Sequence, residues 1–400
     1  MDDYQLSKRV TRIKPSATLA LTARAKALAA EGKDIIALTA GEPEFETPLN
    51  IRQHAIAELT KGGVVSRYTP AAGLPELRKA VAAKFKRDNG LEYKPEQCIV
   101  SCGAKHSIFN ALAALVEDGD EVIVPAPYWV SYPEMCAFLG ARPVIVDTAK
   151  TGMVLTPQAL RDALTARTRV VLVNSPGNPT GAVWSEQQQR ELALALEGTR
   201  IVVISDEIYE KLVYDGRHFS FAACSRDAFS RTVTVNGSAK AFAMTGWRVG
   251  YAAGPKPIID AMVALQSHST SNPATVSQLA TIKALEADPV ELPEWRACYL
   301  RRRDAFVAAL NALPGIHCAN PGGAFYVFPD VRGWLGKRHG ETLLKTDTDV
   351  CDALLAKSLV ATVPGCEFGA PGYLRISYAL SDREVAEAIK RIKAFAAALT

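Results

Sequence analysis

IVVISDEIYE, at residues 201–210, joins a short apolar run to three acidic residues and a tyrosine. A short run that is apolar nearly throughout is typical of a strand covered on both faces. Similar runs occur at CIVS (98–101), EVIVPAP (121–127), PVIVD (143–147), VVLVNSP (170–176) and TVTVNGS (232–238). Helix-like segments such as SIFNALAALVED and SEQQQRELALALE lie between them. This alternation predicts an α/β fold with a mostly parallel central sheet that crossover helices cover.

The pattern changes near residue 290. YLRRRDAFVAALNAL reads as a long amphipathic helix, PGGAFYVFPD as a strand with turn residues ahead of it, and RISYA (375–379) precedes a final helix. We therefore expect a large domain over 48–289 and a smaller α+β domain over 290–400. The N-terminal segment, 1–47, is expected to pack with the smaller domain, because TAGEPEFETP is typical of a loop that crosses between domains.

Composition narrows the class of protein. The 400 residues are 48% hydrophobic and 22% charged, and 46 basic against 42 acidic residues give a net charge of +4. This balance gives no reason to expect a nucleic acid or a membrane as partner. With no signal peptide and no apolar stretch of about 18 residues, we expect a cytoplasmic protein. The eight cysteines are scattered, so reduced thiols and no metal site are expected.

Unusual polar residues follow three of the predicted strands. Asn178, Asp206 and Lys240 lie at or just beyond the carboxyl ends of the runs that start at 170, 201 and 232. In open α/β sheets ligands bind at this edge. The sequence therefore predicts that these three groups, distant along the chain, meet at one face.

These residue types match the demands of pyridoxal phosphate chemistry. A lysine must bond the cofactor and later move protons, and a carboxylate must keep the pyridine nitrogen protonated. Lys240 lies among small residues in VNGSAKAFAMTGWRVGYAAG (235–254), and Asp206 lies at a strand end. Tyr209 follows three residues later, which predicts that both share one face of a helical turn.

Other residues are candidates for binding the phosphate and the substrate. SCGAKHSIFNAL (101–112) predicts a strand–glycine–helix junction whose amides suit a phosphate, and Arg248 lies near enough to assist. Trp129, in PAPYWVSYPE (125–134), offers a flat ring for stacking on the pyridine. Arg375, in GYLRISYA (372–379), has a planar guanidinium that fits a carboxylate.

Each of these residues taken alone has an ordinary structural explanation. A lone lysine is usually a solvated surface residue, Asp206 could cap a helix, and Trp129 could be a core aromatic. Their joint occurrence at successive strand ends favours the functional interpretation. His106 is interpreted as structural or as a residue that supports the site without contacting the ligand.

The motifs also resemble a known family. KPSAT, AGEPEFETP, RYTPAAGLPELR, PAPYWVSYPE, SPGNPTG, SDEIYE, AMTGWRVGY, GAFYV and LRISYA occur in the order found in class I aminotransferases of fold type I. The chain is most similar to the bacterial and plant-type aspartate and prephenate aminotransferase branch. The resemblance extends from about residue 8 to the end, and it implies a pyridoxal-phosphate-dependent aminotransferase.

The resemblance implies a role for each matching residue. Lys240 would be the Schiff-base lysine, Asp206 would pair with the pyridine nitrogen, and Tyr209 and Asn178 would donate to the phenolic oxygen. The remaining roles fall to Gly103, Ala104, Lys105 and Arg248 for the phosphate, Trp129 for the ring, and Arg375, Asn178 and Gly41 for the α-carboxylate. Tyr68 would reach the phosphate in a neighbouring subunit, which implies a homodimer with shared active sites. Where many relatives have serine, this chain has Gly237, so the phosphate role passes to the adjacent Ser238.

Substrate choice rests on two further positions. A lysine at Lys105 is associated in this branch with the distal carboxylate of dicarboxylic substrates, and Thr18 matches a threonine associated with prephenate. We therefore expect L-aspartate, L-glutamate and the 2-oxo acids 2-oxoglutarate or oxaloacetate, with prephenate as a further acceptor. An aromatic or alanine-type aminotransferase or a C–S lyase of the same fold stays open, as does which of residues 269–272 faces the neighbouring site. A transcription regulator of this fold would need a DNA-binding domain, for which the residues before AGEPEFETP leave no room.

Overall fold

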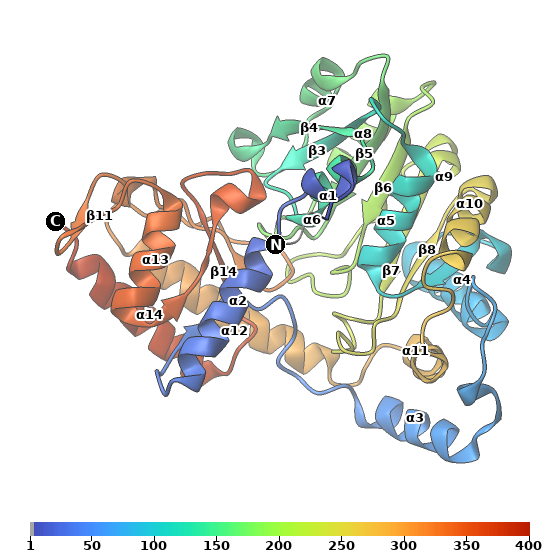
Figure 1. Cartoon of the computed structure of the whole chain (residues 1–400), viewed down its shortest axis with the longest axis horizontal. Helices are drawn as coiled ribbons and strands as arrows, with labels where there is room; N and C mark the ends of the chain where they lie inside the picture. The colour runs from blue at the N-terminus through green and yellow to red at the C-terminus, as the bar shows by residue number, and fades with distance from the viewer. Residues whose placement is uncertain (1–3) are drawn as a thin grey trace.

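The β-branched runs form one seven-stranded sheet in the computed structural model, which describes residues 4–400 (Figure 1). The strand order is β2-β8-β7-β6-β5-β3-β4. Its members are β2 (Cys98–Ser101), β3 (Glu121–Ala126), β4 (Arg142–Asp147), β5 (Thr168–Asn174), β6 (Val202–Asp206), β7 (Thr232–Gly237) and β8 (Gly250–Ala253). All pairs from β7 to β4 are parallel, which confirms the predicted mostly parallel α/β fold.

Strand β8 was missed by the sequence analysis, and it pairs antiparallel with both β2 and β7. Its sequence, GYAA, has no β-branched residue. The reason lies in packing, because a Cβ built at Gly250 would lie 2.1 Å from the backbone nitrogen of Ala104. The start of the next helix passes so close to this strand that only glycine fits there.

Helices cover both faces of the sheet, as expected when alternate strand residues point to opposite sides. Val170 and Leu172 pack with α5 (Ala104–Leu115), α6 (Ser131–Phe138) and α10 (Lys256–Ser267). Val171 and Val173 pack on the other face with α7, α8 and α9. The helices of this second face are α3 (Leu49–Lys61), α4 (Pro75–Asn89), α7 (Pro157–Ala163), α8 (Glu186–Leu196), α9 (Arg226–Arg231) and α11 (Thr275–Leu285).

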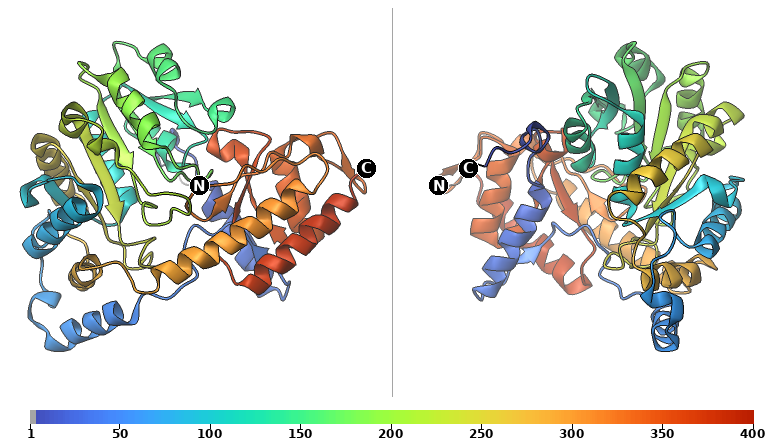
Figure 2. Two further views of the ribbon diagram at one scale, coloured as in Figure 1. Left: turned by 180° about the vertical axis from the view of Figure 1, so that it is seen from behind. Right: turned by 45° about the vertical axis from the view of Figure 1, so that its right-hand side comes forward.

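A smaller group of elements follows α12 (Leu292–Asn311), the long helix that extends from the lower edge of the larger part into the smaller one (Figure 1 and Figure 2). It contains an antiparallel three-stranded sheet of order β13-β14-β9 and a small hairpin. Its elements are β9 (Tyr326–Val327), β10 (Arg338–His339), β11 (Thr342–Leu343), α13 (Asp347–Ser358), β12 (Val360–Ala361), β13 (Val363–Pro364), β14 (Leu374–Ser377) and α14 (Asp382–Ala397). Short 3-10 turns occur at Gly63–Ser66, Pro95–Gln97, Ala149–Thr151, Phe221–Ala223, Arg332–Trp334 and Gly365–Phe368.

The N-terminal segment contacts both parts of the molecule. β1 (Ile36–Ala37) pairs with β12, and α2 (Ala17–Ala30) lies against β12 and β13. After α1 (Lys8–Thr11), however, the backbone N–H of Lys14 donates to Glu134 of α6 at 2.7 Å. The domain boundaries that we expect between residues 47 and 48 and between residues 289 and 290 remain predictions.

The segment after β6 departs from the sequence prediction in its local structure. A helical turn was expected from Asp206 onward, but residues 207–211 form a series of tight turns with no α-helix. The N–H of Glu207 donates to the carbonyl of Val235 at 2.9 Å, so the backbone stays tied to β7 just past the strand end. Asp206 therefore does not cap a helix.

Candidate active site

Three neighbouring strands end at one edge of the sheet and carry the first polar groups of the site. β5 ends at Asn174, β6 at Asp206 and β7 at Gly237, and the register pairs Asn174 with Asp206. The side-chain amide of Asn174 donates to the carbonyl of Asp206 at 2.9 Å, and its oxygen accepts from the N–H of Asn178 at 2.9 Å. The parallel strands thus gather these side chains at the edge where α/β sheets bind ligands.

Asp206 is a buried carboxylate with a hydrogen-bond donor on each oxygen. The Tyr132 hydroxyl donates to Oδ2 at 2.7 Å, and the N–H of Ile208 donates to Oδ1 at 3.3 Å. Burial raises the pKa of Asp206 to about 6, while the two donors act against this rise. A cationic ring nitrogen beside Asp206 would favour its charged form further. The carboxylate is therefore suited to holding a protonated pyridine.

Tyr209 and Tyr326 form a buried hydroxyl pair across the two parts of the molecule. Their hydroxyl oxygens are 2.8 Å apart, and burial raises the pKa of each above its ordinary value. Both remain neutral phenols that can donate a hydrogen bond. Tyr326 Oη would lie 3.4 Å from a Cβ at Gly41, so the Gly41 backbone borders the same space.

Lys240 lies three residues beyond β7, and its ammonium group donates to the carbonyl of Gly41. The Nζ atom lies 5.6 Å from the ring centroid of Tyr209 and 5.8 Å from that of Phe325. Burial lowers the pKa of Lys240 to about 8; Glu42 opposes this shift and two nearby arginines add to it. A neutral amine is thus accessible near neutral pH.

Arg375 is a buried cation with no carboxylate partner among residues 4–400. Its Nη1 donates to Asn178 Oδ1 at 3.1 Å and its Nη2 to the carbonyl of Thr39 at 2.7 Å, while Nε has no partner. The guanidinium also lies over the rings of Tyr326 and Phe368, at 4.9 and 5.1 Å from their centroids. Because burying an unpaired charge is costly, this arrangement fits an anionic ligand.

The start of α5 forms a cradle for a phosphate. Gly103 has a φ of 90°, and a Cβ there would lie 2.6 Å from Arg248 Nη2. No side chain caps the helix start. The hydroxyl of Ser238 is buried without a hydrogen-bond partner in the described chain. Open helix amides, a nearby guanidinium and an unpartnered hydroxyl match the donor set that a phosphate requires.

Lys105 and Trp129 lie together beside this cradle. The Nζ atom of Lys105 is 4.8 Å from the Trp129 ring centroid. Tyr132 packs edge-on against the same ring, with centroids 5.3 Å apart and planes at 83°. The orientation of the Trp129 ring is thus fixed from one side by Tyr132.

Two predicted residues lie outside this set of contacts in the single chain. Tyr68 is 93% exposed. Thr18 lies near the start of α2, and its carbonyl accepts from the Thr22 hydroxyl at 2.8 Å. The Thr22 hydroxyl is in turn 2.9 Å from the hydroxyl of Thr39, so Thr18 is linked to the site only through these two residues. Neither residue contacts the groups gathered around Lys240.

Sequence reasoning missed three residues that the structure adds. Tyr132, Tyr326 and Thr39 contact Asp206, Tyr209 and Arg375 respectively. Tyr132 lies three residues after Trp129 in the quoted PAPYWVSYPE segment, so that spacing was the available signal. His106 accepts a hydrogen bond from the N–H of Cys102 at 3.4 Å, in keeping with a structural role.

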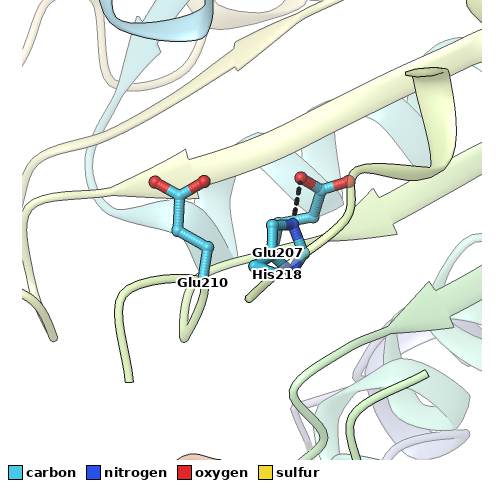
Figure 3. Close-up of side chains that lie close together, drawn as sticks. All are labelled: Glu207, Glu210 and His218. Atoms are coloured by element: carbon cyan, nitrogen blue, oxygen red, sulfur yellow. Dashed lines mark hydrogen bonds and ion pairs between the residues drawn. The ribbon is translucent and has the colours of Figure 1, made fainter. Parts of the chain in front are cut away.

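A second group of titratable side chains comes from the segment that follows Asp206, where Glu207, Glu210 and His218 bring their ligand atoms within 4.8 Å of one another (Figure 3). Protein donors already fill these positions. Glu207 accepts from Ser205 and lies 2.9 Å from the His218 ring, and Glu210 pairs with Lys84. These contacts are hydrogen bonds and ion pairs of the chain itself, and we do not assign them to a metal.

Comparisons with known proteins show the family to which the chain belongs. Residues 33–392 match the family described as aminotransferase class I and II. An aspartate aminotransferase of Bacillus sp. (strain YM-2) is 45% identical, with 98% of each chain covered. An aspartate/prephenate aminotransferase of Cereibacter sphaeroides is also 45% identical, with 99% of each covered. The crystal structure of the aspartate aminotransferase from Rhizobium meliloti aligns with a TM-score of 0.95 at 43% identity, covering 99% of this chain and 100% of that one.

The fold and the site together define a pyridoxal-phosphate-dependent transferase of fold type I. The sequence identity to these relatives, 43–45% over nearly the whole chain, is higher than a shared fold alone would explain. The chain belongs to the class I and II aminotransferase family.

Proposed function

We propose that this enzyme moves an amino group between L-aspartate or L-glutamate and the 2-oxo acids 2-oxoglutarate or oxaloacetate, in ping-pong order. The observation that carries the proposal is the buried, carboxylate-free Arg375, which comes from the smaller part of the chain and meets Asn178 beside Lys240 and Asp206. A substrate carboxylate would supply the missing charge partner. Relatives named aspartate aminotransferase support the choice of amino acid.

The residues of the chain divide the work among them. Pyridoxal phosphate supplies the electron sink for the electrons left at the substrate Cα. Asp206 holds a proton at the ring nitrogen, and Tyr209 donates to the phenolic oxygen. Lys240, with its pKa lowered to about 8 by burial, would take the proton from the substrate Cα and pass it to the carbonyl carbon of the cofactor within the first half of the turnover, and it would move a proton in the opposite direction in the second half. Arg375 fixes the carboxylate so that the Cα–H bond stays directed at Lys240.

Cofactor binding completes the assignment of the remaining residues. The amides of Ala104 and Lys105, the Ser238 hydroxyl and Arg248 would hold the phosphate, and Trp129 would stack on the ring. The N–H of Gly103, which was also expected to take part, already donates to the Ser101 carbonyl at 2.7 Å. We expect the Lys105 ammonium, which lies 4.8 Å from the Trp129 ring centroid, to bind the distal carboxylate of a dicarboxylic substrate. The relative named aspartate/prephenate aminotransferase supports prephenate as a second acceptor, with Thr18 as the candidate contact.

A second copy of the chain is part of the proposal. Tyr68 is 93% exposed, and Leu49, Ile56 and Leu59 of the nearby helix α3 expose 55–62% of their surface. In a homodimer this surface would be covered, and Tyr68 would reach the phosphate of the neighbouring site. We place the enzyme in the cytoplasm. None of the described helices is both long and apolar enough to cross a membrane.

The test is a visible absorption titration of the purified protein loaded with pyridoxal phosphate. Addition of L-aspartate without an oxo acid is expected to bleach the yellow band, and 2-oxoglutarate is expected to restore it. A protein that bleaches only with aromatic or apolar amino acids would refute the dicarboxylate assignment. Release of ammonia and pyruvate would identify a C–S lyase instead. A protein that stays colourless with the cofactor would refute the role of Lys240.

A further inference from the structure

The turn after β6 contains two pairs of residues, Asp206 with Tyr209 and Glu207 with Glu210, and each pair makes its own set of contacts. The N–H of Glu210 donates to the carbonyl of Glu207 at 2.9 Å, which closes a tight turn. In such a turn, residues three positions apart lie on the same side. Asp206 and Tyr209 make the site contacts described above. Glu207 and Glu210 (Figure 3) make a separate set of buried contacts, with Ser205 and His218 and with Lys84 respectively.

Glu207 anchors the beginning of this turn. Its Oε1 atom accepts from the hydroxyls of Ser205 and Ser220, both at 2.8 Å, and its Oε2 atom lies 2.9 Å from His218 Nε2. Glu207 is 1% exposed. The carboxylate thus ties the strand end to the segment around residues 218–221.

Glu210 anchors the end of the turn through Lys84 of helix α4. The two side chains form an ion pair and are 5% and 3% exposed. Asn89 completes the group, because its amide donates to Glu210 Oε2 at 2.9 Å and its oxygen accepts from Lys84 Nζ at 2.8 Å. Each polar atom of this pair therefore has a directed partner on α4 or in the turn.

A buried ion pair of this kind is a poor source of stability, because desolvation offsets the attraction between the charges. A well-packed apolar pair of similar volume would stabilise the fold to about the same extent. The apolar pair would lack directed contacts, however, and directed contacts are what fix the position of a turn that contains no helix. Tyr209 directly precedes Glu210, so a shift of the backbone at Glu210 would also move Tyr209.

We propose that the Lys84–Glu210 ion pair is a positioning device that holds Tyr209 and Asp206 toward the cofactor. The inference rests on the proposed function, in which these two residues contact the pyridoxal ring. Lys84 and Glu210 themselves touch neither cofactor nor substrate. Their effect is exerted through the backbone of the turn.

The test is the double variant Lys84→Met/Glu210→Leu, with Tyr209→Phe as reference. The apoprotein is expected to unfold at a somewhat lower temperature than the parent protein, because Asn89 loses both of its hydrogen-bond partners. Its dissociation constant for pyridoxal phosphate is expected to rise about tenfold, as for the loss of one good hydrogen bond. The visible band of the bound cofactor should move in the same direction as in Tyr209→Phe, a signature that loss of stability alone would not produce.

Glu121→Gln is the matched control, because Glu121 is an equally buried carboxylate at the amino end of β3, far from the strand edge that carries the site. It should leave the dissociation constant and the band unchanged. A stable double variant with unchanged cofactor affinity and band would overturn the proposal. If the double variant does not fold, Glu210→Gln decides, since a several-fold weaker affinity supports positioning and an unchanged one refutes it. Failure of the parent protein to bind the cofactor would instead refute the proposed function.

Discussion

Tyr132→Phe removes one atom and tests the electrostatics of the site directly. The Tyr132 hydroxyl donates to Asp206 Oδ2 at 2.7 Å in a buried setting, while the ring packs against Trp129. Phenylalanine keeps the ring packing and deletes only the donor. The carboxylate is then left with the longer bond from Ile208, at 3.3 Å.

The expected magnitude follows from the strength of that bond. A hydrogen bond to a charged group contributes roughly 1.5–3 kcal/mol, and one pKa unit corresponds to about 1.4 kcal/mol. Loss of the Tyr132 donor should therefore raise the pKa of Asp206 by about 1–2 units from its value of about 6. The direction is upward because the lost donor favoured the charged carboxylate.

The assay is the pH dependence of pyridoxal phosphate binding to the apoprotein. Because an ionised Asp206 is needed to hold the pyridinium, affinity should weaken below the pKa of Asp206, and this midpoint should move upward in Tyr132→Phe. Tyr93→Phe is the control, since Tyr93 is also buried and its hydroxyl lies 3.1 Å from that of Thr234, away from the site. An unshifted midpoint in Tyr132→Phe, or an equal shift in the control, would refute the reasoning.

The remaining predictions concern separate parts of the site. Arg375→Lys should lower kcat/KM about 10- to 100-fold, through loss of the bidentate contact, and unchanged steady-state kinetics would contradict this. Lys105→Ala should reduce activity on L-aspartate far more than on L-alanine, and equal losses would refute its role. Gly103→Ala should weaken cofactor binding in a spectroscopic titration, because the new Cβ would meet Arg248 Nη2 at 2.6 Å. The pKa of Asp206, raised from 3.8 to about 6, should cost the apoprotein about 3 kcal/mol of stability as the pH rises from about 4 through 6. Asp206→Asn should abolish that loss in urea unfolding.

Local pattern predicted much of the fold. Six of the seven sheet strands were recognisable as β-branched runs, because residues buried on both faces must be apolar and extended chain favours β-branched side chains. Strand β8 was not predicted, because its sequence has no β-branched residue. Gly250 is required there by the close approach of the Ala104 backbone, which the local pattern does not reveal. The turn at 207–211 was expected to be helical for a similar reason, because its shape depends on buried contacts with α4.

The sequence by itself determined the order of the strands along the chain and the placement of Asn178, Asp206 and Lys240 near strand ends, because parallel strands bring their carboxyl ends to one edge. Only the tertiary structure decided which groups those residues meet. Arg375 lies 197 residues from Asn178 along the chain, yet the two share a buried hydrogen bond. Tyr132 of α6 likewise donates to Asp206, 74 residues away along the chain. Periodicity records which face of an element is buried, whereas a hydrogen-bond partner depends on which distant element packs on that face.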